Sequence, residues 1–248
     1  MFTLLRRLMI VAAFMLCGCE ERKDDTIIIF GTSADYPPFE FYKDGNLSGF
    51  DIDLANAVAK KLGKTAKFED AQFSSIFAGL GSGTIDVGIA SLNPTAERQK
   101  NYDFSIVYYR SVMALVHKRN DVKLNTDDMA NVKVACQLGS TQESWMRQNR
   151  RQANIMLIDN VVQAVELIKA GRVDGVLVDG AIASTLCSEN SVLVFTVVAD
   201  LSDSDEGGSA MVVKKGSSLK KQLDDAIREL DESGELLAIK KKWNLVCE

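Results

Sequence analysis

The sequence predicts an α/β protein of two lobes, each with a mixed, mostly parallel sheet flanked by helices, joined by a two-strand hinge. Two segments far apart in the chain, 77–91 and 166–179, share one pattern. In each, a helix ends at glycine, Gly-x-Ile/Val-Asp follows, and an apolar strand ends at a polar residue. Such units build parallel sheets with ligand sites at the strand ends. Their separation favours two lobes, although all βα units resemble one another to some degree.

The hinge is predicted from two similar apolar strands, 112–117 and 209–214, that flank the middle third of the chain. If the chain enters a second lobe near residue 111 and returns near residue 208, the two crossings lie together. Hinge closure around a ligand is a standard switching mode. The predicted division is lobe 1 at residues 26–110 and 208–248, and lobe 2 at residues 111–207.

The first elements of lobe 1 follow from local patterns. Residues 26–30 (TIIIF) form a continuous, largely β-branched run, which is typical of a buried strand. The loop 31–38 is stiffened by two prolines. Residues 51–62 place their apolar side chains on one helical face, and Gly63 ends the helix.

The stretch 85–98 is predicted to present polar groups at the end of a strand. After a strand at 66–69 and a helix at 74–80, the apolar strand 87–90 runs into Ser91 and Asn93, and a helix carrying Arg98 begins at Pro94-Thr95. Hydroxyl, amide, backbone N–H and guanidinium groups at one strand end suit a small carboxylate. The alternative is an ordinary strand-loop-helix with a solvent-facing arginine.

The rest of the chain alternates strands and helices by the same criteria. The further predicted elements are strands at 133–136 and 154–158 and helices at 141–151, 161–170, 180–187, 217–231 and 233–243.

The composition is that of an ordinary globular protein with room for two modest cores. The chain has 248 residues, 46% hydrophobic and 25% charged, with a formal net charge of -5. An acidic balance argues against nucleic acid or an anionic membrane surface as the main partner.

The N-terminus predicts export. Arg6 and Arg7 precede the apolar run 8–16, which is too short to span a bilayer stably. A cleaved signal sequence therefore explains this stretch better than a retained transmembrane helix.

The run ends in LCGC (16–19), which resembles the bacterial lipoprotein signal, where cleavage precedes a cysteine that becomes lipidated. The resemblance implies a signal peptide at 1–18, a lipid-anchored Cys19 as the first mature residue, and a tether at 19–25. Plain secretion with Cys19 as an ordinary thiol is the alternative.

The remaining cysteines suggest no metal site. Cys136 lies in the strand-like VKVAC and is expected in the core, and no two cysteines have metal-type spacing. An exported location permits a Cys187–Cys247 disulfide.

Catalytic motifs are missing from the sequence. The chain has one histidine, His117, no Walker, GxSxG or GxGxxG pattern, and no evident base for a seryl nucleophile. We therefore expect a binding protein without a cofactor or metal rather than an enzyme.

Several blocks in order resemble the polar amino acid substrate-binding proteins of ABC importers, across essentially all of the mature chain. The blocks are DYPPFEF (35–41), GFDIDLANAVAKKLG (49–63), the GTID to SLNPTAER stretch (83–98), YDFSIVYY (102–109), QLGSTQES (137–144), GRVDGVLVD (171–179) and KKKWN (240–244). The resemblance implies a type II periplasmic-binding-protein fold. It also implies a monomer that closes on one free amino acid and delivers it to a membrane permease.

The resemblance also implies roles for individual residues. Arg98 would clamp the ligand α-carboxylate, helped by N–H groups of Ser91 and of Thr141, which follows Ser140 at a helix start in the other lobe. Asp179, with acceptors near Ser91 and Asn93, would hold the α-ammonium group. The family usually has Ser or Thr where Asn93 stands, and the amide oxygen of Asn93 would serve as the acceptor here.

Side-chain selectivity is implied by the same loop. Tyr36 and Phe73 would sandwich the ligand side chain, and two aromatic faces suit a guanidinium. Basic amino acid binders of the family often carry an acid where Ser33 lies, and Asp35 or Glu40 would have to supply the anion instead. Both are equally interpretable as solvated loop charges. Arginine or another basic amino acid is the first expectation, and glutamine or another polar amino acid is the second.

Two alternatives of other classes are considered. Exported cyclohexadienyl dehydratases, which act on prephenate or arogenate, resemble this family, but no general acid stands out in the sequence. The chain as a sensory module of a receptor is the third interpretation, disfavoured because no transmembrane or signalling segment follows.

Overall fold

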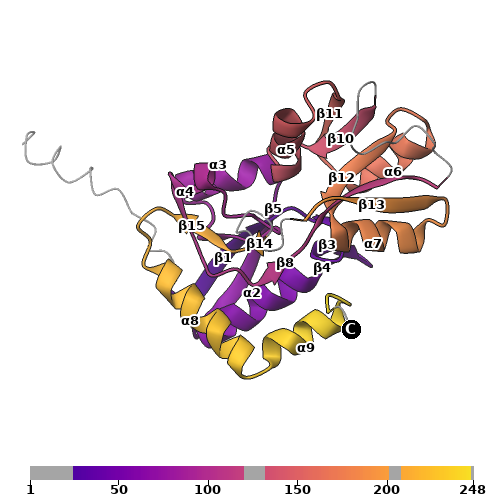
Figure 1. Ribbon diagram of the computed structural model, residues 1–248. Coiled ribbons are helices and arrows are strands. Elements are labelled where there is room, and N and C mark those ends of the chain that lie inside the picture. The colour runs from indigo at the N-terminus through magenta and orange to yellow at the C-terminus, as the bar shows by residue number, and fades with distance from the viewer. Residues whose placement is uncertain (1–24, 120–131, 201–207, 247–248) are drawn as a thin grey trace, which may run out of the picture.

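The computed structural model describes residues 25–119, 132–200 and 208–246, which form two lobes (Figure 1). Each lobe contains a five-stranded sheet. Figure 1 shows helices packed around both sheets, with α2, α8 and α9 on the first lobe and α5, α6 and α7 on the second. The α/β two-lobed architecture predicted from the sequence is confirmed.

The sheet of lobe 1 has the strand order β5-β1-β6-β15-β7. The first three strands are parallel to one another, and β15 pairs antiparallel with both β6 and β7. The bounds are β1 (Ile27–Thr32), β5 (Thr65–Asp70), β6 (Val87–Gly88), β7 (Tyr102–Phe104) and β15 (Val212–Lys214).

The sheet of lobe 2 has the order β11-β10-β12-β9-β13 and repeats this arrangement, in which β9 pairs antiparallel with the strands on both of its sides and the other four strands share one direction. The bounds are β9 (Met113–Lys118), β10 (Lys133–Gln137), β11 (Asn154–Ile158), β12 (Gly175–Asp179) and β13 (Leu193–Ala199). The edge strand β13 is not among the elements predicted from the sequence.

The Asp of each Gly-x-Ile/Val-Asp motif has the same structural role in its lobe. Asp86 Oδ2 accepts from the Ile29 N–H at 2.9 Å, and Asp174 Oδ2 accepts from the Lys133 N–H at 2.7 Å. Each carboxylate thus ties the strand that follows it to the neighbouring parallel strand, which is β1 in lobe 1 and β10 in lobe 2. The two similar segments therefore perform equivalent structural roles in the two lobes.

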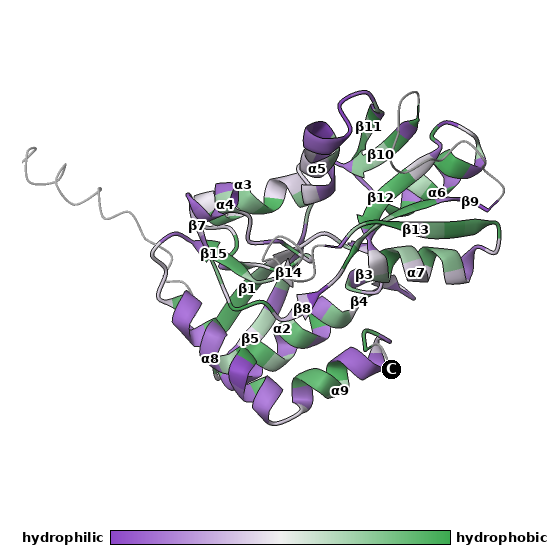
Figure 2. Ribbon diagram, viewed as in Figure 1, coloured by the Kyte–Doolittle hydropathy of each residue, from purple (hydrophilic) through white to green (hydrophobic). Residues whose placement is uncertain are grey.

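The helices fall close to their predicted positions. Figure 2 shows that α8 has a hydrophilic and a hydrophobic face, and its buried residues include Leu223, Ile227 and Leu230. The bounds are α2 (Phe50–Lys61), α3 (Ile76–Ser82), α4 (Ala96–Gln99), α5 (Thr141–Asn149), α6 (Val162–Lys169), α7 (Gly180–Glu189), α8 (Leu219–Glu232) and α9 (Glu235–Lys242), and a 3₁₀ turn, η2 (Phe73–Ser75), precedes α3. No helix within the described ranges is long and apolar enough to cross a membrane.

Two small sheets lie where the lobes meet. The predicted strand 209–214 is divided in two, because β14 (Gly208–Ser209) leaves the sheet of lobe 1 and pairs antiparallel with β8 (Tyr109–Arg110). The loop that carries the aromatic and acidic residues forms a small three-stranded sheet of β2 (Asp35–Tyr36), β3 (Glu40–Lys43) and β4 (Asn46–Ser48).

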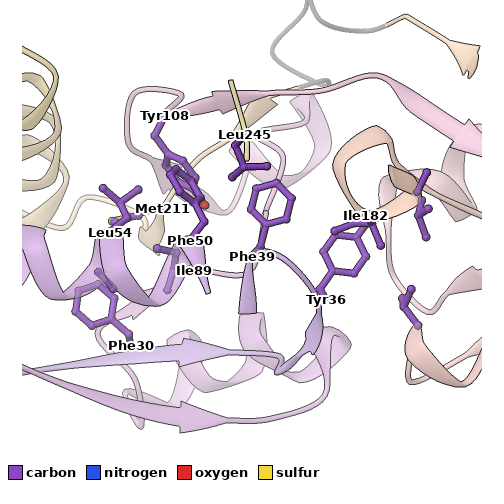
Figure 3. Packing of buried hydrophobic residues seen from close by; sticks show 14 of the residues in the cluster. Phe30, Tyr36, Phe39, Phe50, Leu54, Ile89, Tyr108, Ile182, Met211 and Leu245 are labelled. Atoms are coloured by element: carbon purple, nitrogen blue, oxygen red, sulfur yellow. The ribbon is translucent and has the colours of Figure 1, made fainter. Parts of the chain in front are cut away.

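The largest hydrophobic cluster includes buried residues of both lobes. Figure 3 shows Phe39, Phe50 and Tyr108 grouped in the first lobe, with Tyr36 lying between them and Ile182 of the second. Cys136 is fully buried, as predicted. Cys187 is a free thiol, whereas Cys19 and Cys247 lie outside the described residues.

Candidate functional site

Polar residues of the two lobes contact one another directly, and we call this region the inter-lobe site. It is built from the ends of β2, β6 and β12, the beginning of α5, and α4. Its members are Tyr36, Ser91, Asn93, Arg98, Thr141, Gln142 and Asp179.

Arg98 is held rigidly in this site. Its Nη1 donates to the Asn93 carbonyl oxygen at 3.0 Å and its Nη2 donates to the Gly139 carbonyl oxygen at 2.9 Å. The guanidinium carbon lies 5.8 Å from the ring centre of Phe73 and 5.1 Å from that of Phe77. Burial lowers the pKa of Arg98 to about 10, which leaves the group charged at neutral pH. Within the described part of the chain, this cation forms no ion pair.

Two backbone donors complement the guanidinium. Thr95 caps α4 and accepts from the Arg98 N–H, and Ser140 caps α5 and accepts from the Glu143 N–H. The N–H groups of Asn93 and Thr141 donate to no acceptor among the described residues. A charged guanidinium together with two unpaired N–H groups, of which that of Thr141 is at the N-terminus of α5, is chemically suited to a carboxylate.

Asp179 provides the opposite charge at the end of β12. Its carboxylate accepts from the Tyr36 hydroxyl at 3.2 Å, from Ser91 Oγ at 3.4 Å and from Gln142 Nε2 at 3.0 Å. Desolvation raises the pKa of Asp179 to about 6 despite these donors. No cation pairs with it within the described ranges, so a bound ammonium group would complete its electrostatics.

Asn93 joins the lobes through its amide. Its Oδ1 accepts from Thr141 Oγ1 at 3.0 Å, and its Nδ2 donates to the Gly208 carbonyl oxygen at 3.0 Å. The amide oxygen that was expected near the ligand ammonium group is therefore already bonded to the second lobe.

Ser91 differs from expectation in one respect. Its backbone lies in the left-handed region with φ 46°. In that conformation its N–H donates to Asp51 Oδ2 at 2.8 Å. The expected donation of this N–H to a ligand carboxylate is therefore wrong for this conformation, while the hydroxyl faces Asp179 Oδ2 and Ser209 Oγ.

The two aromatic residues that were predicted to sandwich the ligand side chain are nearly buried. Tyr36 is 7% exposed and Phe73 is 8% exposed. Tyr36 belongs to the large cluster and Phe73 to a smaller one in lobe 1. Each also contacts a charged residue of the site, since Tyr36 bonds to Asp179 and Phe73 faces Arg98.

Asp35 bridges the lobes beside this site. Its Oδ2 accepts from the Val161 N–H at 2.8 Å and from Gln137 Nε2 at 3.2 Å, both in lobe 2. Ser33 Oγ donates to Asp35 Oδ1 at 3.1 Å. Glu40, the other acid proposed to face a ligand side chain, is instead buried in lobe 1 next to Asp51.

Sequence reasoning missed four contributors to the inter-lobe region. Gln137 and Gln142 are buried amides of lobe 2, Gly139 supplies a carbonyl oxygen, and Ser209 bonds to Ser91. Three of them lie in the QLGSTQES block, which carried part of the family resemblance without indicating which of its side chains face the site. No group of three His, Cys, Asp or Glu residues able to hold a metal occurs in the described ranges.

The two-lobed fold and an inter-lobe site with opposite charges define a solute-binding protein of the periplasmic type. The family model "Bacterial extracellular solute-binding proteins, family 3" matches residues 28–246. The chain belongs to this family.

Curated relatives of this chain have different ligands in their names. It is 33% identical over 239 residues to the arginine-binding extracellular protein ArtP of Bacillus subtilis (strain 168), covering 94% of this chain and 93% of the relative. It is 34% identical over 225 residues to the L-cystine-binding protein TcyJ of Escherichia coli (strain K12), covering 89% and 84%.

Solved structures agree in fold. An ancestral arginine-binding protein bound to arginine matches with a TM-score of 0.80 at 35% identity, covering 88% of this chain and 98% of that one. The ancestral amino acid-binding protein AncCDT-1, a precursor of cyclohexadienyl dehydratase, matches with a TM-score of 0.79 at 29% identity, covering 88% and 95%.

Proposed function

We propose that this protein captures one free amino acid between its lobes and delivers it to the membrane subunits of an ABC importer. The proposal is carried by two opposite charges in one site. Among the described residues, the Arg98 cation has no acidic partner and the Asp179 carboxylate has no cationic partner. An amino acid backbone offers the complementary carboxylate and ammonium groups at a fixed short separation.

Within this proposal, Arg98 and the N–H groups of Asn93 and Thr141 bind the carboxylate. Asp179 binds the ammonium group, with Tyr36, Ser91 and Gln142 orienting it. Contacts such as Asn93 with Thr141 join the lobes directly, which supports closure as part of binding. The lobe boundaries at residues 110/111 and 207/208 and a monomeric state belong to the same proposal.

For the ligand side chain we propose arginine or another basic amino acid. Tyr36 and Phe73 supply aromatic faces, and Asp35 with Gln137 supplies polar groups from opposite lobes. Arginine binding by ArtP and by the ancestral protein favours the same choice. Glutamine, cystine or another polar amino acid is the alternative, since Asp35 already accepts hydrogen bonds from lobe 2.

A thermal-shift panel of the mature domain against the twenty amino acids and cystine tests this proposal. Ligand at a hundredfold excess over Kd stabilises the folded state by about 2.7 kcal/mol. We expect arginine to give the largest shift and calorimetry to give a one-to-one complex. Failure of every amino acid to stabilise the protein would contradict the proposal.

We further propose that the chain binds without catalysis. The Asp179 carboxylate accepts three side-chain hydrogen bonds, which suits a cation-binding role better than proton donation to a leaving group. Incubation of the purified protein with prephenate and arogenate should yield no product, and turnover of either would revive the dehydratase alternative.

Export and anchoring complete the proposal. The family is extracellular by its description, and the run 8–16 followed by Cys19 supports a cleaved lipoprotein signal. These residues lie outside the described ranges. The lipid would hold the protein at the outer face of a membrane next to its permease.

A further inference from the structure

Two acidic side chains meet in the interior of lobe 1, behind the inter-lobe site. Glu40 of β3 is 1% exposed and Asp51 in the first turn of α2 is 0% exposed. The chain brings them together because the Asp51 N–H donates to the Phe39 carbonyl oxygen at 2.9 Å. Neither acid forms an ion pair with a described residue.

The hydrogen bonds of these acids are unequal. Asp51 Oδ2 accepts from the Ser91 N–H at 2.8 Å and from the Tyr108 hydroxyl at 3.0 Å. Asp51 Oδ1 and Glu40 Oε2 are buried, and neither oxygen is paired with a backbone N–H, a hydroxyl group or an amide of a described residue. The two carboxyl groups lie close enough for one of them, when protonated, to donate a hydrogen bond to the other.

A hydrogen bond between two carboxyl groups requires a proton on one of them. Two buried carboxylates without a cation would also repel each other strongly. Burial and the neighbouring Asp51 hold the pKa of Glu40 well above its ordinary value, and burial raises that of Asp51 to about 6. Glu40 is therefore the protonated partner, and Asp51, with two other donors, is the carboxylate.

Ser91 connects the pair to the binding site, because its N–H donates to Asp51. This residue has a positive φ of 46°, a conformation that is unfavourable for a non-glycine residue and that needs support from its surroundings. The support is the Asp51 carboxylate, which holds the Ser91 N–H. The Ser91 hydroxyl then faces Asp179 and Ser209.

We infer that Glu40 and Asp51 are a positioning pair that shares one proton. The protonated Glu40 donates a hydrogen bond to Asp51, and the Asp51 carboxylate holds Ser91 in its conformation at the binding site. Neither acid touches the ligand. The inference rests on the proposed function only where it concerns ligand binding, because the shared proton is a property of the free protein.

The groups that face the pair are all acidic. The nearest titratable neighbours of the pair are the phenols of Tyr36 and Tyr108, and the carboxyl groups of Asp35 and Asp179 act at longer range. No described cation lowers the pKa of Glu40. Each of these groups, when ionised, favours retention of the shared proton. The pair should consequently keep one proton through neutral and mildly alkaline pH.

Infrared spectroscopy of the ligand-free protein at pH 8 tests the shared proton directly. A buried carboxylic acid has a C=O stretching band separate from carboxylate bands. We expect this band in the wild type and in Asp225→Asn, a control at an exposed acid of α8. Glu40→Gln should abolish it. A wild-type spectrum without the band, or a band that survives Glu40→Gln, would overturn the inference.

Ligand binding tests the positioning role. Glu40→Gln keeps an N–H donor toward Asp51 and should change Kd for the best amino acid less than threefold, whereas Glu40→Leu should raise it about tenfold. Equal binding by Glu40→Leu and wild type would refute the positioning role. If Glu40→Leu does not fold, Tyr108→Phe replaces it, and we expect its affinity to fall by about threefold. If the wild type binds no amino acid, the proposed function fails while the infrared test still stands.

Discussion

Tyr36 and Asp179, which are 143 positions apart in the chain, are joined by two hydrogen bonds across the lobes. The Tyr36 hydroxyl donates to Asp179 Oδ2 at 3.2 Å, and it accepts from the Asp179 N–H at the same distance of 3.2 Å. Together with Ser91 and Gln142, it orients a carboxylate that no described cation neutralises. A ligand ammonium group would supply that charge, and the consequence is measurable.

Amino acid binding should weaken in acid. The pKa of Asp179 is raised to about 6, chiefly by burial, and an ammonium group pairs only with the ionised form. Affinity should fall about tenfold from pH 7 to pH 5, and binding at pH 5 should release the proton that the free protein carries on Asp179. Titration calorimetry in buffers of different ionisation enthalpy measures both quantities. Asp179→Asn should bind weakly without this pH dependence, and Asp225→Asn should keep it.

The same pKa has the opposite effect on folding. Because the folded value lies above the unfolded value of 3.8, protonation stabilises the ligand-free fold with respect to this group. The stability that protonated Asp179 contributes to the ligand-free fold is fully present below pH 3.8 and is lost as the pH rises through about 6. Thermal unfolding should show Asp179→Asn gaining stability relative to the wild type between pH 4 and pH 7.

Arg98→Ala should remove binding of every amino acid. The guanidinium is held by two carbonyl oxygens and two aromatic rings, so it is preorganised for a bidentate contact. We expect affinity to fall at least about a hundredfold, and Arg98→Lys to restore little, because an ammonium group lacks the fork. Arg147→Ala, at an exposed arginine paired with Glu143, is the control. Tight binding by Arg98→Ala in calorimetry would rule out this site.

Phe73→Ala should weaken binding and broaden the side-chain preference. Its ring lies against Arg98 and packs in the smaller cluster of lobe 1, so truncation costs about 3 kcal/mol or more of stability. Phe73→Leu keeps apolar volume without the aromatic face. If a guanidinium stacks here, Phe73→Leu should lose more affinity for arginine than for glutamine in competition binding. Equal losses would argue against stacking.

Asp35→Ala should favour the open form of the protein. The carboxylate accepts from the Val161 N–H at the beginning of α6 and from Gln137, so it joins the lobes directly. Small-angle scattering should show a larger radius of gyration without ligand, and Kd should rise about tenfold. Asp70→Ala is a matched control, because Asp70 accepts from the Ala34 N–H inside lobe 1. An unchanged radius and affinity for Asp35→Ala would contradict the bridging role.

Cys19→Ser should release the protein from the membrane. Several acyl chains anchor strongly, since each buried CH₂ contributes about 0.8 kcal/mol. In producing cells, the wild type and Cys17→Ser should remain in the membrane fraction, and mass spectrometry should find acyl chains on Cys19. Membrane association of Cys19→Ser would disprove the anchor.

Local sequence patterns predicted most elements of both lobes. Residues 154–158 form a strand as expected, and Ser140 caps α5 where the Gly139-Ser140-Thr141 sequence indicated a helix start. The missed strand β13 is an edge strand with exposed Phe195 and Val197, so its pattern lacks a clean alternation of buried and exposed residues. Glu40 was misjudged because an acid in a loop is usually solvated.

The sequence by itself determined the two-lobed plan, because each lobe repeats a locally encoded unit whose Asp86 or Asp174 ties neighbouring strands together. It also placed Arg98 and Asp179 after apolar strands, and the resemblance to the family implied their roles. Only the tertiary structure decided which atoms meet: Asp35 with Val161, and Glu40 with Asp51. Hydrophobic periodicity reports which face of an element is buried. The partner of a buried polar atom depends on how distant elements pack, and a one-dimensional pattern does not contain that information.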